Sequence, residues 1–139
     1  MVTLDCTKMK YTLFLIGTLL VSLSACKDNY PIDEDGLLIT TRSECYVSSF
    51  ELLGADFQTV RTKAAVVDTV AQTINVEVLF GTDLKSLYPQ FSLVTDAILD
   101  PKILGKEDFS NLGTPREWTV VSGNRKVRKT YKVYLTVQK

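Results

Sequence analysis

The sequence of 139 residues contains no histidine and only three cysteines, and these absences limit the chemistry that it can perform. A Ser-His-Asp relay is impossible without an imidazole, and a cysteine nucleophile such as Cys45 would lack its usual base. Zinc sites depend on histidine and cysteine ligands, so none is expected here. We therefore expect a protein that is not an enzyme and that needs no metal ion or other cofactor.

An excess of positive charge is also missing. The 16 basic side chains are matched by 16 acidic ones, which gives a formal net charge of zero. Nucleic-acid binding depends on basic residues that displace counterions from the phosphates. The charge balance therefore argues against a nucleic-acid partner.

No hydrophobic run in the sequence reaches the length of about 20 residues that a membrane-spanning helix needs. The apolar run over residues 11–23 follows two lysines and ends at small residues before Cys26. A basic start, a short apolar stretch and small residues before a cleavage point predict a secretory signal peptide over residues 1–25. Met9 is an alternative to Met1 as the true start, because a signal opening at Met9 would have ordinary proportions.

The end of this segment, Leu23-Ser24-Ala25-Cys26, resembles the lipobox of bacterial lipoproteins. The resemblance implies that the Cys26 thiol receives a diacylglyceryl group, that the signal is cut before Cys26, and that the new amino terminus is acylated. The protein would then be held in the cell envelope by its lipid, as an outer-membrane lipoprotein that faces inward or outward. Cys45 would have no disulfide partner, so we expect it to be a small buried hydrophobic residue.

Residues 26–37 contain the lipidated cysteine and a predicted flexible tether. Residues 27–36 include four acidic side chains, one proline and one glycine, without an apolar period. Such a segment cannot bury enough apolar surface to offset the entropy lost on ordering it. Acidic residues soon after the cysteine also resemble a surface-export signal of Bacteroidetes lipoproteins, although only Asp28 lies close to Cys26. A solvated spacer and an export signal both stay open.

Over residues 38–139 the hydrophobic pattern has a period of two, which is typical of strands with one buried face. Residues 73–78 and 131–137 alternate most clearly, and shorter candidates are 38–42, 46–53, 62–67, 90–94, 97–99 and 117–121. We expect residues 83–88 to form one helical turn that Pro89 ends. The short strands and their turns predict an all-β fold, a single immunoglobulin-like antiparallel β-sandwich of about seven strands.

The strand pattern also predicts which side chains are buried. Trp118 shares a face with Val120, which favours a place in the core over a role as a ligand platform. Glu77 and Lys132 are expected to be exposed. The residues expected to be mostly buried are Ile74, Val76, Val78, Phe91, Trp118, Val120, Tyr131, Val133 and Leu135.

A succession of short motifs carries a resemblance that covers about residues 46–139. The motifs are Gly81-Thr82-Asp83-Leu84, Leu87-Tyr88-Pro89, Phe91-Ser92-Leu93, Asp108-Phe109-Ser110, Trp118-Thr119-Val120 and Lys129-Thr130-Tyr131-Lys132-Val133. In this order they resemble the small immunoglobulin-like domain that is common in Bacteroidetes outer-membrane lipoproteins. The resemblance implies a domain that stands alone or in front of a carbohydrate-related module, with no catalytic residues assigned to it.

Two side chains of the last strand are candidates for ligand binding. Tyr134 points away from the face of Val133 and Leu135, and an exposed tyrosine can stack on a sugar ring. Lys132 belongs to a basic cluster that could meet an anionic glycan or lipid headgroups. Charges on an edge hairpin would also discourage strand-to-strand aggregation, which is the favoured explanation. The cluster consists of Arg125, Lys126, Arg128, Lys129 and Lys132.

Acidic residues offer weaker alternatives. Asp100, Glu107 and Asp108 could flank a glycosidic bond, but they lie in a loop, where carboxylates are usually solvated. The spacing of Asp96, Asp100 and Asp108 does not match a calcium-binding loop. The sequence therefore favours a non-catalytic, lipid-anchored binding or accessory module, with surface glycan capture as its function. The alternative is a structural or assembly subunit that pairs with another envelope protein through a sheet edge.

Overall fold

Seven strands and no helix make up residues 29–139, the part of the chain that the computed structural model describes. The strands are β1 (Val47–Leu53), β2 (Val66–Asp68), β3 (Thr73–Val78), β4 (Tyr88–Leu93), β5 (Ile98–Asp100), β6 (Arg116–Val121) and β7 (Arg128–Val137). Within these described residues there is accordingly no helix that could cross a membrane. The predicted signal peptide and Cys26 lie outside them. Residues 32–139 form one compact unit, which contains all seven strands.

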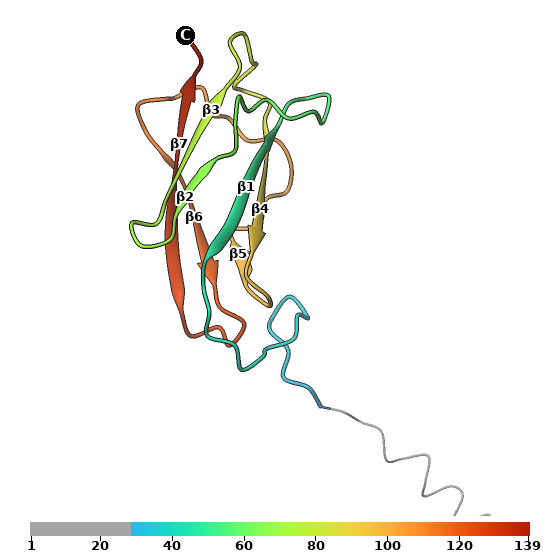
Figure 1. The fold of residues 1–139 in the computed structure, drawn as a ribbon. Helices are drawn as coiled ribbons and strands as arrows, with labels where there is room; N and C mark the ends of the chain where they lie inside the picture. The colour runs from blue at the N-terminus through green and yellow to red at the C-terminus, as the bar shows by residue number, and fades with distance from the viewer. Residues whose placement is uncertain (1–28) are drawn as a thin grey trace, which may run out of the picture. The chain divides into compact units, whose positions relative to one another are not determined.

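The strands form two sheets that pack as the predicted β-sandwich (Figure 1). One sheet contains β1 and β4, and the other has the order β2-β3-β7-β6-β5. The prediction of a purely antiparallel sandwich is wrong at one place, because β3 and β7 run parallel. Parallel neighbours need a long crossover connection, and here β4, β5 and β6 provide it. The alternation within a strand reports its buried face but not its direction, so the sequence pattern could not reveal this pairing.

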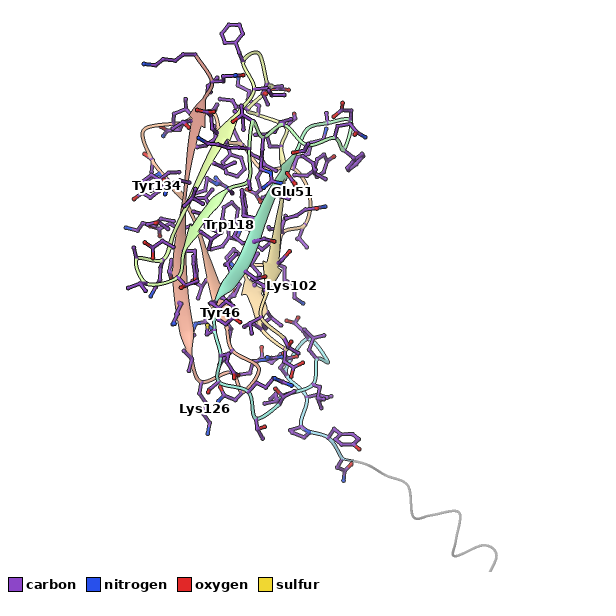
Figure 2. All side chains as sticks on the ribbon, in the orientation of Figure 1. Tyr46, Glu51, Lys102, Trp118, Lys126 and Tyr134 are labelled. Atoms are coloured by element: carbon purple, nitrogen blue, oxygen red, sulfur yellow. The ribbon has the colours of Figure 1, made fainter. Side chains whose placement is uncertain are left out.

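The core lies between the sheets and contains eight of the nine residues expected there. Those eight are at most 7% exposed. Phe91, the ninth, is partly buried and packs against the core, with 5.3 Å between the centre of its ring and that of Trp118. Figure 2 shows Trp118 between the two sheets. Lys132 is exposed as expected, whereas Glu77 is half-buried because the Thr62 hydroxyl donates a 2.6 Å hydrogen bond to its carboxylate.

Two local predictions are wrong. Residues 84–86 form a turn and a bend rather than a helical turn, Tyr88 already belongs to β4, and Pro89 lies inside this strand, opposite Leu52. β4 belongs to a sheet of two strands and is therefore an edge strand, where a residue without an N–H group is tolerated. The strand expected over residues 38–42 is reduced to an isolated bridge between Ile32 and Leu38.

Two side chains of the core, those of Cys45 and Tyr131, form hydrogen bonds with backbone groups. The Cys45 thiol is 3% exposed, as predicted, and its Sγ lies 3.1 Å from the carbonyl oxygen of Val120, to which it donates. Burial raises the pKa of this thiol, so it is held in the unreactive protonated form. The hydroxyl of Tyr131, which is fully buried, accepts a hydrogen bond of 3.4 Å from the N–H group of Val47 in the other sheet.

Candidate functional site

The outer face of the five-stranded sheet carries both side chains that the sequence singled out for ligand binding. Val133 and Leu135 point into the core, so the alternate positions 132 and 134 of β7 face outward. Tyr134 is 40% exposed and is paired in register with Asn75 of β3. Figure 2 shows Tyr134 projecting from the sheet on the side away from Trp118. Lys132 and Tyr134 therefore belong to one surface.

Lys132 borders an open hollow of about 820 Å³ at one end of this surface. Lys132 of β7 and Glu117 of β6 are paired in register, and Lys132 Nζ lies 3.7 Å from Glu117 Oε1. Residues of the 108–115 segment line the hollow as well. The hollow is polar and contains charges of both signs, which suits a ligand rich in hydroxyl groups.

Carboxylates around the hollow are held by donors of the chain. Hydrogen bonds from Ser110 lower the pKa of Asp108, and its backbone N–H lies 2.8 Å from Asp108 Oδ1. Glu107 forms an ion pair with Arg116, whose guanidinium carbon also lies 5.6 Å from the centre of the Trp118 ring. Both carboxylates are therefore already engaged by groups of the chain.

The basic cluster has a different setting from the one predicted. β7 lies at the centre of its sheet, so protection of an edge hairpin is the wrong explanation. Arg128 forms an ion pair with Asp100, and Arg125 forms one with Asp33. Three of the five basic residues thus have acidic partners, counting the Lys132–Glu117 contact, whereas Lys126 and Lys129 form no ion pair with the described residues. Within the described residues 29–139, no group of three or more acidic or cysteine side chains could hold a metal ion.

Sequence reasoning missed a pair of aromatic side chains on the other sheet. The rings of Phe57 and Tyr88 lie 4.8 Å apart between their centres, with an angle of 30° between the ring planes. Phe57 follows the turn Gly54-Ala55-Asp56, and Tyr88 begins β4. An aromatic residue directly after a polar turn was the available signal. It was missed because residues 83–88 were expected to form a helical turn, which would have placed Tyr88 elsewhere.

Comparison with known proteins identifies relatives of this domain. The model of a family described as "SGBP, N-terminal" matches residues 54–135, which is more than half of the chain. A solved structure of a glycoside hydrolase candidate from Bacteroides thetaiotaomicron is 29% identical, with a TM-score of 0.57 over 69% of this chain. The match covers only 26% of that protein, so this chain spans about a quarter of its length.

Two further solved structures match the same share of this chain. A DUF4623 family protein from Bacteroides eggerthii is 16% identical, with a TM-score of 0.50 over 69% of this chain and 22% of its own. A candidate secreted protein from Bacteroides fragilis is 11% identical, with a TM-score of 0.49 over 69% of this chain and 97% of its own. The comparison with curated proteins gave no match.

Proposed function

The chain belongs to the SGBP N-terminal family, a group associated with surface glycan binding, and from this we propose that it is an accessory module for glycan capture at the cell surface. The match over residues 54–135 is the observation that carries the proposal. The module is non-catalytic, because the chain has no histidine and the loop carboxylates are held by Arg116, Arg128 and Ser110.

The proposed binding surface is the outer face of the five-stranded sheet around Tyr134 and Lys132. The exposed ring of Tyr134 offers an apolar plane on which a sugar ring can stack. Lys132, with Glu117 beside it, offers hydrogen-bonding groups at the edge of the hollow. Arg125, Arg128 and Lys132 of the basic cluster are already paired with acidic residues, which favours a neutral polysaccharide over a strongly acidic one.

The proposal includes the place of the protein in the cell. A surface-glycan family is consistent with the cell envelope, and the lipobox supports an outer-membrane lipoprotein attached through Cys26. The direction in which the domain faces then follows from function, because a module that captures glycans must face outward. The alternative, an assembly subunit that pairs through a sheet edge, has less support. In the five-stranded sheet the edge strands β2 and β5 have three residues each and offer little backbone for strand addition, so such pairing would have to use β1 or β4 of the other sheet.

Affinity gel electrophoresis over neutral and acidic polysaccharides tests the proposed function. The full chain, purified in detergent, should be retarded by at least one neutral polysaccharide and should hydrolyse none. Tyr134→Ala should weaken the retardation by about tenfold in apparent affinity, because stacking supplies much of the contact area. Tyr46→Ala is the matched control, since Tyr46 is 38% exposed and lies on β1's side of the molecule (Figure 2).

Lys132→Ala, compared with Lys126→Ala at the exposed turn before β7, tests the contribution of the hollow. A loss with Lys132→Ala alone would support a role for the hollow. Absence of retardation on every polysaccharide, together with co-purification of a stoichiometric envelope protein, would replace the proposal with the assembly-subunit alternative.

A further inference from the structure

The outer face of the β1–β4 sheet presents a second set of side chains suited to a ligand. Phe50 and Leu52 of β1 are buried, so the alternate residues Glu51 and Leu53 face outward. Across the sheet they are paired in register with Gln90 and Tyr88 of β4, respectively. Gln90 is exposed and Tyr88 is half-buried. This face lies opposite the Tyr134 surface, as Figure 2 shows for Glu51 and Tyr134 on either side of Trp118.

A tight turn holds the ring of Phe57 against the ring of Tyr88. The Phe57 N–H donates to the carbonyl oxygen of Gly54 at 3.0 Å, and the Gly54 N–H donates back to the carbonyl oxygen of Gln58 at 2.9 Å. Phe57 adopts a φ of 59°, a left-handed conformation that is rare for a bulky side chain and costs free energy. Its side chain is nevertheless 62% exposed, so burial of the ring does not repay the strain. Such strain, kept where it does not serve packing, is characteristic of functional sites.

The charge of Glu51, beside the aromatic pair, is compensated. Glu51 forms an ion pair with Arg61 and accepts a 2.8 Å hydrogen bond from the Thr59 hydroxyl. Burial alone would raise the pKa of Glu51, but hydrogen bonds from Leu52, Thr59 and Arg61 outweigh it and lower the pKa. Glu51 therefore stays ionised and paired. The exposed polar groups near the rings are the amide of Gln90 and the carboxylate of Asp56, which accepts a 3.2 Å hydrogen bond from the Gln58 N–H. A carboxylate next to Phe57 disfavours an acidic ligand.

We infer that Phe57 and Tyr88 form a second carbohydrate site, on which a neutral pyranose ring stacks while the Gln90 amide hydrogen-bonds its hydroxyl groups. A pyranose ring has an apolar C–H face and a rim of hydroxyl groups. The C–H face can stack on an exposed aromatic ring. The hydroxyl groups can bind a side-chain amide, which both donates and accepts hydrogen bonds. The inference rests on the proposed function, because it assigns a further site to the same glycan-binding module. With sites on opposite faces, one domain could hold two segments of polysaccharide.

Isothermal titration of the full chain in detergent with maltohexaose, cellohexaose, mannohexaose and xylohexaose tests the site. For a hexasaccharide that binds, Phe57→Ala should raise Kd by at least about tenfold, whereas Phe57→Tyr should keep it within about twofold. Phe80→Ala is the matched control and should leave Kd unchanged, because Phe80 is 81% exposed in a different loop. Gln90→Ala removes an exposed strand side chain without disturbing the turn and should raise Kd by about fivefold.

Loss of binding with Phe57→Ala and Gln90→Ala, but not with Phe80→Ala, would support the site. Equal Kd values for Phe57→Ala and the parent chain would overturn it, as would the absence of binding to all four hexasaccharides. The result is separable from the fate of the proposed function. Hexasaccharide or polysaccharide binding that falls with Tyr134→Ala and not with Phe57→Ala would overturn this inference and leave the proposed function standing.

Discussion

Asp33 and Arg125 lie 92 residues apart in the sequence and form an ion pair at the turn between β6 and β7. The distance from Asp33 Oδ2 is 2.9 Å to Arg125 Nη2 and 3.0 Å to Nε, and both side chains are less than one-fifth exposed. Arg125 also donates 3.1 Å hydrogen bonds to the carbonyl oxygens of Ser122 and Gly123. The contact fastens the segment that precedes the first strand to the turn between β6 and β7. The expected domain boundary at residue 38 stays a prediction, but part of the predicted tether contacts the domain.

Asp33→Asn should lower the urea midpoint at neutral pH and should have no effect in strong acid. Hydrogen bonds from the Leu37 backbone, then from Arg125 and Asp35, lower the pKa of Asp33 from its ordinary value of 3.8. A carboxylate with a depressed pKa in the folded state adds stability above pH 3.8, and this contribution is lost as pH falls through the lower folded pKa. Urea melts from pH 7 to about pH 2 check this. Glu34→Gln, at an exposed neighbouring position, is the control. A constant difference between parent and Asp33→Asn at all pH values would contradict the prediction.

Val133→Ala and Lys132→Ala test the register of β7. Val133 is 1% exposed, so its truncation should lower the free energy of unfolding by about 1–3 kcal/mol through lost burial and a residual cavity. Lys132 is exposed and its contact with Glu117 is a surface ion pair, so its truncation should change the free energy by less than about 0.5 kcal/mol. Denaturant melts of the two variants provide the measurement. The reverse ranking would mean that β7 is displaced by one residue.

Cys26→Ala tests the lipid anchor, which the sequence alone predicts. Incorporation of radiolabelled palmitate should be abolished, and the protein should appear in the soluble fraction or accumulate as precursor. The physical reason is that acyl chains hold a protein on a bilayer by about 0.8 kcal/mol per buried CH₂ group. Cys45→Ala is the matched control, because the buried Cys45 is no substrate for acylation and its loss should leave labelling intact. Unchanged labelling of Cys26→Ala would refute the anchor.

The sequence was most informative where alternation was long and uninterrupted. The bounds predicted for β3 match the structure, and those for β7 lack only residues 128–130, because hydrophobic side chains on one face of a strand must all reach the same core. The burial of Trp118 is confirmed for the same reason, and that of Cys45 follows from its lack of a disulfide partner. Local rules failed where a tertiary setting overrides them. Proline usually ends a helix, but Pro89 is accommodated within β4 because that strand lies at the edge of its sheet.

Contacts between distant segments were beyond sequence reasoning. The stacking of Phe57 on Tyr88 joins a turn to a strand 31 residues further along the chain, and neither residue belongs to a periodic pattern. The two predicted ligand residues, Lys132 and Tyr134, were placed on one face by alternation alone. Residues of the 108–115 segment line the hollow beside Lys132. Their position depends on how a loop packs, which the hydrophobic periodicity of the strands does not encode.

The parallel pairing of β3 with β7 determines the order in which the domain can fold. Thr73 pairs with Lys132, 59 residues later, and β7 joins β3 to β6 at the centre of its sheet. Such non-local contacts require a large loop to close before they stabilise anything, which makes folding slow compared with that of helical domains. Until β7 has left the ribosome, neither β3 nor β6 can form its hydrogen bonds with β7. The domain would therefore stay unfolded until β7 has been released.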